Sequence, residues 1–91
     1  MKKIQLANEA IKLTNERLAV AADFQILKSV KAQLEYILDS FQKNKIPTDV
    51  EKDRVTLGVL AVREFEDNDS EYADILEKVS YVYKHPEIDE M

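Results

Sequence analysis

One glycine, Gly58, stands among the 91 residues of this sequence, and this scarcity limits the folds open to the chain. β-Sandwiches and β-barrels contain many tight turns, and those turns favour residues that tolerate a positive φ. A lone glycine also excludes a glycine-rich phosphate-binding loop. The absence of cysteine excludes disulfides, thiol nucleophiles and CxxC metal sites. With 45% hydrophobic and 34% charged residues, the chain has a globular composition, and its length suits one domain.

Apolar residues recur at helical spacing over four segments, which predicts four amphipathic helices. The first two helices are expected at 2–19 and 24–44, with Asp23 as the N-cap of the second. The residues between them include neither glycine nor proline, so one continuous helix is the alternative. A T-x-x-E capping box predicts that the third helix starts at Thr48, and its apolar pattern extends to residue 65.

The fourth helix is expected to begin with Asp69 as its N-cap and to stop at His85, before a proline. Short connections between helices favour antiparallel neighbours. We therefore predict an all-α fold, a compact antiparallel four-helix bundle. The helical domain is expected to cover residues 1–85, with 86–91 as a short C-terminal tail.

The third helix is expected to be central, because apolar residues cover about half of its surface. Gly58 lies near the middle of this half. A glycine inside a helix costs roughly 1 kcal/mol relative to alanine, so we expect a neighbouring helix to approach it closely. The other residues predicted to be buried on this helix are Val50, Val55, Leu57, Val59, Ala61, Val62 and Phe65. On the fourth helix they are Tyr72, Ile75, Leu76, Val79, Val82 and Tyr83.

The net charge of −5 is unevenly distributed along the chain. Residues 1–45 carry +3 and residues 46–91 carry −8. Seven carboxylates and no basic residue lie between Glu64 and Glu77. Such a block repels the phosphates of nucleic acids, but it attracts a basic protein surface and speeds encounter with it. A solvated helix surface without a partner is the alternative.

The residues needed for catalysis or metal binding do not form a recognisable pattern. The one histidine, His85, is expected at the surface near a helix end. Asp67, Asp69 and Glu71 are spaced like the first ligands of a calcium loop, but Tyr72 stands where that loop requires glycine. We therefore predict no catalytic site, no metal, no cofactor and no enzymatic activity.

Three side chains depart from the amphipathic pattern of their helices. Tyr36 lies off the apolar arc of the second helix, Leu60 lies on the charged side of the third, and Tyr81 shares a surface with acidic residues. Single exposed apolar residues are common. Tyrosine beside charges is also typical of binding surfaces, so Tyr81 is the strongest candidate of the three.

The stretch 54–66, RVTLGVLAVREFE, with the acidic turn through Asp69, resembles the small helical immunity proteins of type VI secretion. Segments 31–37 (KAQLEYI) and 80–83 (SYVY) are similar to the same family. Together these matches cover most of residues 24–84. The chain departs from the family at 20–22 and at Ser70, where the family has helix-breaking proline or glycine. These departures affect loop geometry more than the fold.

The resemblance implies a function in inhibition. The best-known family member neutralises a secreted toxin that hydrolyses NAD and NADP. By resemblance, this chain would lie in the cytoplasm and inhibit a cognate toxin, an NAD(P)+ glycohydrolase, by occluding its active-site cleft. A toxin that binds an anionic dinucleotide is expected to have a basic cleft, which carboxylates would complement. The residues expected to contact the toxin's catalytic domain are Glu64, Glu66, Asp67, Asp69, Asp74 and Tyr81.

A dimeric all-α adaptor or regulator without a toxin partner is the alternative function. The wide apolar side of the first helix would then place Leu6 and Leu13 against a second chain, so a homodimer stays open. An enzyme is the third hypothesis, and a substrate-sized ligand would be needed to support it. No nucleic-acid partner is expected, because the acidic block repels phosphates. No membrane partner is expected, because the first residues do not form a signal peptide and no apolar run approaches membrane-spanning length.

Overall fold

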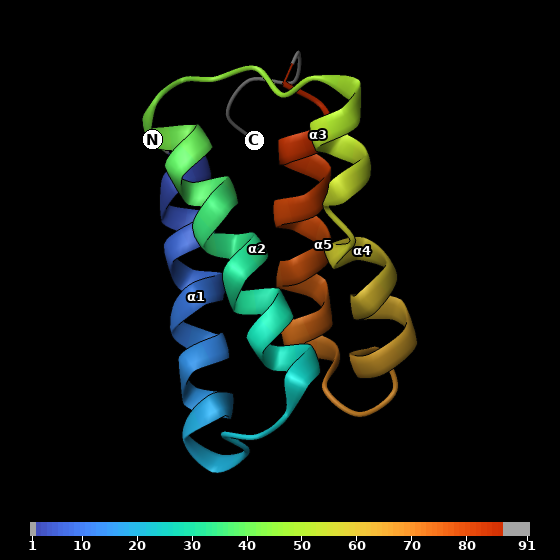
Figure 1. The fold of residues 1–91 in the computed structure, drawn as a ribbon. Coiled ribbons are helices and arrows are strands. Elements are labelled where there is room, and N and C mark those ends of the chain that lie inside the picture. The colour runs from blue at the N-terminus through green and yellow to red at the C-terminus, as the bar shows by residue number, and fades with distance from the viewer. Residues whose placement is uncertain (1, 87–91) are drawn as a thin grey trace.

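The computed structural model describes residues 2–86, and in this range the chain is helical with no strand. Figure 1 shows the helices running up and down along one long axis, in a molecule of 35 × 21 × 20 Å. The predicted all-α class with a four-helix bundle is confirmed, with the third helix divided into three pieces. The elements are α1 (Lys2–Val20), α2 (Gln25–Gln42), α3 (Asp49–Arg54), α4 (Leu57–Leu60), the π-helix η1 (Ala61–Phe65) and α5 (Ser70–Lys84).

The first two helices are separate, so the alternative of one continuous helix is wrong. The chain turns through residues 21–24, where the Phe24 amide donates to the Ala21 carbonyl at 3.1 Å. Phe24 is the N-cap residue of α2, and no side chain among residues 2–86 caps this helix. The predicted cap by Asp23 is therefore wrong. The ring of Phe24 instead lies edge-on to that of Phe65, 6.5 Å away, so an aromatic contact fixes this end of α2.

The predicted third helix is interrupted after α3. The capping box at its start is confirmed, since the Thr48 hydroxyl accepts from the Glu51 amide and the Glu51 carboxylate accepts from the Thr48 amide. Val55 then adopts an extended conformation, and the amide of Thr56 donates to Gln33 Oε1 at 2.8 Å. Gln33 Nε2 in turn donates to Thr56 Oγ1 at 2.9 Å. The side-chain amide of Gln33 thus hydrogen-bonds both the backbone amide and the side-chain hydroxyl of Thr56 at the break.

The helix that follows the break does not keep the predicted apolar arc. In η1 the Glu66 amide bonds to the Ala61 carbonyl, five residues back, and this wider turn changes the angular spacing of the side chains. Leu57, Ala61 and Phe65 are buried as predicted. Leu60, predicted to lie on the charged side, is partly buried against the core. Val59 and Val62, predicted to be buried, are exposed because the chain buries only one side of α4 and η1. Val50, also predicted to be buried, is exposed on α3, which has no buried residue.

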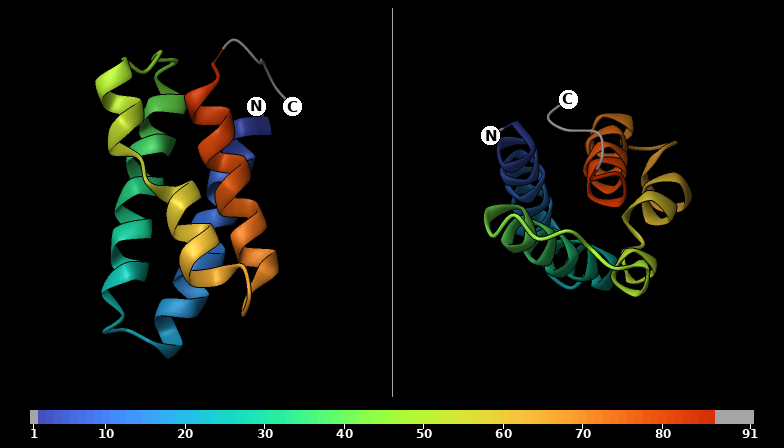
Figure 2. Two further views of the ribbon diagram at one scale, coloured as in Figure 1. Left: turned by 90° about the vertical axis from the view of Figure 1, so that its right-hand side faces the viewer. Right: turned by 90° about the horizontal axis from the view of Figure 1, so that it is seen from above.

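The core lies between α1, α2 and α5, with α4 and η1 packed on the side of α5 (Figure 2). The buried stripe predicted for α5 is confirmed, with Ile75 only partly buried. Gly58 does face a neighbouring helix, because a Cβ atom added there would lie 3.5 Å from Ser80 Oγ. That distance is an ordinary van der Waals contact, so the packing does not require glycine. The buried apolar residues are Ala7, Ala10, Leu27, Val30, Leu34, Ile37, Phe41, Val55, Leu57, Ala61, Phe65, Tyr72, Ala73, Leu76, Val79, Val82 and Tyr83.

Candidate functional site

The residues predicted for the interface lie in two regions of the surface. Four belong to the end of η1 and the turn before α5, whereas Asp74 and Tyr81 lie farther along α5. Twelve residues separate Asp69 from Tyr81, which corresponds to about 18 Å at the rise of an α-helix. The fold thus arranges these residues as a strip along α5 rather than as one compact patch. The members at the turn are Glu64, Glu66, Asp67 and Asp69.

Asp69 is held by a basic side chain from α1. Arg17 Nε donates to Asp69 Oδ2 at 2.6 Å, and Arg17 Nη2 donates to Asp69 Oδ1 at 2.9 Å. These hydrogen bonds lower the pKa of Asp69 below its ordinary value and raise the pKa of Arg17. The side chains are 24% exposed for Arg17 and 31% for Asp69. Asp69 therefore fixes the start of α5 against α1, a contact between residues 52 positions apart that the sequence pattern did not reveal.

The same arginine belongs to a chain of polar contacts that reaches into the core. Its guanidinium lies 4.4 Å from the ring centroid of Tyr72, whose hydroxyl is 2.6 Å from Thr14 Oγ1. Thr14 donates its one hydroxyl proton to the carbonyl of Ala10 at 2.8 Å, so Tyr72 is the donor to Thr14. Burial raises the pKa of Tyr72, which keeps it a neutral donor at physiological pH. This network is structural, because its members are turned inward.

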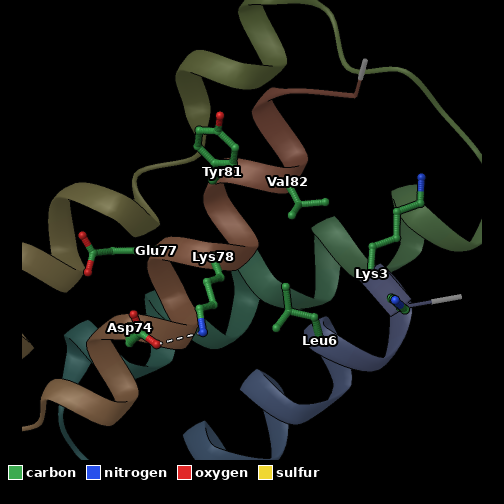
Figure 3. Close-up of a pocket in the computed structure, with 8 residues that line it drawn as sticks. Lys3, Leu6, Asp74, Glu77, Lys78, Tyr81 and Val82 are labelled. Carbon is green, nitrogen blue, oxygen red and sulfur yellow. Dashed lines mark ion pairs between the residues drawn. The ribbon is translucent and has the colours of Figure 1, made fainter. Parts of the chain in front are cut away.

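A groove of about 560 Å³ lies between the N-terminal part of α1 and the outer side of α5 (Figure 3). Leu6, Val82 and the ring of Tyr81 give it apolar walls. Lys78 Nζ pairs with Asp74 Oδ2 at 3.0 Å across one turn of α5, as the dashed line in Figure 3 marks. The charged residues along the groove are Lys2, Lys3, Asp74, Glu77 and Lys78.

The groove corrects the expectation of a purely acidic surface. Three lysines and two carboxylates line it, although the sequence block up to Glu77 contains no basic residue. The folding of α1 beside α5 brings Lys2 and Lys3 to this surface, and Lys3 Nζ also lies 5.4 Å from the ring centroid of Phe41. The acidic block of the sequence therefore meets basic side chains where its last members line the groove.

Tyr81 and Tyr36, both predicted to be exposed, differ in their surroundings. Tyr81 is 48% exposed, and its ring lies 4.3 Å from that of His85, one turn later on α5. The Tyr36 hydroxyl donates to Glu51 Oε2 at 2.7 Å, and this hydrogen bond raises the pKa of Tyr36. The pKa of Glu51 is lowered by the backbone amide of Thr48 and then by Tyr36. Tyr36 thus ties α2 to α3, whereas Tyr81 presents its ring to solvent.

Among residues 2–86, no group of three or more His, Asp or Glu side chains is arranged to hold a metal ion. The calcium-like run at Asp67, Asp69 and Glu71 is not such a group, because Asp69 is engaged by Arg17. Within the same range, no helix combines the length and the apolar character that crossing a membrane requires.

Comparison with known proteins identifies the family. The family model of Tsi6 matches residues 2–85. This chain belongs to the Tsi6 family. The immune protein Tsi6 of Pseudomonas aeruginosa is 32% identical over 82 residues, which cover 90% of this chain and 86% of that protein. This relation confirms the resemblance to small immunity proteins drawn from the sequence.

Solved structures agree with this assignment to the Tsi6 family. A chain in the structure of Tse6 in complex with Tsi6 superimposes with a TM-score of 0.85 at 30% identity, over 96% of this chain and 92% of that chain. The structure of Tsi6 from Pseudomonas aeruginosa superimposes with a TM-score of 0.81 at 30% identity, over 91% of this chain and 85% of that one. The match extends over nearly the whole bundle.

Proposed function

We propose that this chain is an immunity protein that binds a cognate toxin related to Tse6 and inhibits it. The observation that carries this proposal is the match, over 96% of the chain, to a chain in the structure of Tse6 in complex with Tsi6. Family membership over residues 2–85 supports it further. On this proposal the chain carries out no reaction of its own and acts in the cytoplasm, where it meets the toxin.

Inhibition would follow from occlusion of the toxin's catalytic cleft. The resemblance drawn from the sequence suggests that the toxin hydrolyses NAD(P)+, and a cleft that binds this anion is expected to be basic. Carboxylates at the η1–α5 turn and along α5 would complement such a cleft and speed encounter. The rigid bundle presents these groups without a folding step, so little conformational entropy is lost on binding.

The proposed contact residues differ in how exposed they are and in whether another side chain already holds them. Glu66 and Asp67 are exposed at the turn, and Glu64 is half-buried just before it. Asp74 and Tyr81 lie at the outer side of α5. We assign direct contacts to these five residues. Asp69 contributes by holding the turn in place through Arg17.

The alternative of a dimeric adaptor receives no support from the described residues. Leu6 and Leu13 were expected to face a second chain, but both are partly buried and pack against the core of their own chain. The apolar side of α1 is therefore used within the bundle. A homodimer stays a hypothesis without an observation in its favour.

Co-expression with a candidate toxin related to Tse6 tests the proposed function. Cells that produce the toxin's catalytic domain should survive only when this chain is produced with it, and the two proteins should purify together. A charge-neutral variant of the turn, E66Q/D67N, should bind more slowly at low salt. Cell death despite soluble expression of both proteins would contradict the proposal.

A further inference from the structure

Two valines on the interrupted third helix are exposed although the sequence pattern predicted them to be buried. Val59 on α4 is 55% exposed and Val62 on η1 is 51% exposed. They lie three residues apart, so their side chains neighbour each other on the helix surface. Single exposed apolar residues are common, but two adjacent ones form a small apolar patch.

The position of this pair follows from the contact between α4 and α5. Gly58 faces Ser80, and the two helical segments run antiparallel (Figure 2). Val62, one turn after Gly58, therefore lies about level with Glu77, which precedes Ser80 by three residues. Figure 3 shows Glu77 leaving α5 on the side of α4. On the same outer side of α5, Tyr81 lies one turn after Glu77 and is 48% exposed.

We use the name α4–α5 face for the surface formed by Val59, Val62, Glu66, Asp74, Glu77 and Tyr81. Its apolar members are two valines and one tyrosine, and its three charged members are all carboxylates. Arg63 is exposed next to Val62, and Lys78 pairs with Asp74. Lys2 and Lys3 lie across the groove that Tyr81 lines, so basic groups also border this face. Glu66 and Glu77, which are unpaired among residues 2–86, lie on the α4 side of this face, so an apolar partner surface with basic groups opposite these two carboxylates would match it.

The backbone irregularities of the third helix explain why the pair is exposed. The Gln33 side chain holds the break at Thr56 with two hydrogen bonds, so α4 starts with a new orientation. The π-helical turn then widens the spacing after Ala61. π-Helical turns are uncommon and occur frequently at functional sites. Both irregularities lie in the segment that carries Val59 and Val62.

We propose that Val59, Val62 and Tyr81 form the apolar centre of the surface that binds the toxin. The inference rests on the proposed function, and it adds Val59 and Val62 to the contact residues expected from the sequence. The partner surface would present apolar side chains with lysine or arginine opposite Glu66 and Glu77. Binding would bury the two valines and the tyrosine ring, while the surrounding carboxylates would pair with the basic groups at the rim.

The isosteric double substitution V59T/V62T tests this inference. Threonine keeps the shape and helix propensity of valine but places a hydroxyl where the interface would exclude water. The matched control is V20T/V50T, since Val20 and Val50 are 90% and 61% exposed and lie outside the α4–α5 face. Calorimetric titration against the toxin's catalytic domain should show a loss of affinity of about tenfold or more for V59T/V62T. The control pair should bind within about twofold of the wild type.

The charge of the partner is tested by V62R and V62E. With a basic partner surface, V62R should weaken binding more than V62E does, and the difference should shrink at high salt. Equal affinities of wild type and V59T/V62T, or a preference for V62R, would overturn the inference while leaving the immunity function in place. Absence of binding by the wild type would refute the proposed function itself. Unfolding of V59T/V62T, seen by circular dichroism, would contradict the exposure on which the inference rests.

Discussion

Replacing Asp69 with asparagine tests how the start of α5 is held against α1. Two nitrogens of Arg17 donate to the two carboxylate oxygens at 2.6 and 2.9 Å, and about a quarter to a third of each side chain is exposed. Exposed ion pairs contribute about 0–1 kcal/mol, whereas removing one partner of a buried pair costs roughly 3–5 kcal/mol. The Arg17–Asp69 pair is partly buried and joined by two charged hydrogen bonds. We therefore expect D69N to lower the free energy of unfolding by about 1–2 kcal/mol, a value between the two ranges.

Urea unfolding followed by circular dichroism measures this cost. In a chain of this size, a loss of 1–2 kcal/mol should also lower Tm by roughly 5–15 °C. The matched control is D74N, because Asp74 also pairs with a cation but both Asp74 and Lys78 are mostly exposed. The free energy of unfolding of D74N should equal that of the wild type within error. If D69N were as stable as D74N, the structural role assigned to Asp69 would be wrong.

The pH dependence gives a second test of the same contact. Hydrogen bonding to Arg17 lowers the pKa of Asp69 in the folded protein below its ordinary value of 3.8. A lowered folded pKa stabilises the protein above the unfolded pKa, and this contribution is lost as pH falls through the folded pKa. The stability difference between wild type and D69N should therefore be constant near neutral pH and shrink below about pH 4. A difference that stayed unchanged down to about pH 2 would refute the argument.

Three further substitutions test the third helix and its contacts. G58A should raise the free energy of unfolding, measured in urea, by about 0.5–1 kcal/mol, since a Cβ fits against α5 at an ordinary contact distance. Destabilisation would show that α4 and α5 pack more tightly than this distance implies. Q33A removes both hydrogen bonds at Thr56, so it should lower the free energy of unfolding by about 1 kcal/mol and speed hydrogen exchange of the Thr56 amide. Unchanged exchange would show that Gln33 does not hold the break. Y36F should raise the pKa of Glu51 toward its ordinary value in an NMR titration, and no change would show that the Tyr36 hydroxyl does not lower it.

Features that depend on neighbouring residues in the sequence could be predicted. The apolar spacing of α2 and α5 gave their extent to within two residues. The capping box at Thr48 was correct because both of its hydrogen bonds join residues three positions apart. The Asp69 N-cap position was also correct, although its carboxylate bonds to Arg17 instead of to the amides of α5.

Features that depend on residues far apart in the sequence could not be predicted. The break before α4 is held by Gln33, which is 23 positions away from Thr56. Because the local pattern does not contain that partner, it predicts one continuous helix through Val55 and places the valines at 59 and 62 in the buried half of that helix. The lysines of α1 that approach α5 were missed for the same reason, so the strip of proposed contact residues is less uniformly acidic than its sequence suggested.

Inhibition of the toxin by the purified chain is the measurement that bears most directly on the proposed function. The toxin's catalytic domain would be assayed for the NAD(P)+ hydrolysis proposed for it while the chain is added in increasing amounts. Hydrolysis should fall to zero in a saturable manner as the complex forms, with the same midpoint in a direct binding titration. Full hydrolysis in the presence of excess folded chain would contradict the proposal that this protein neutralises the toxin by binding it.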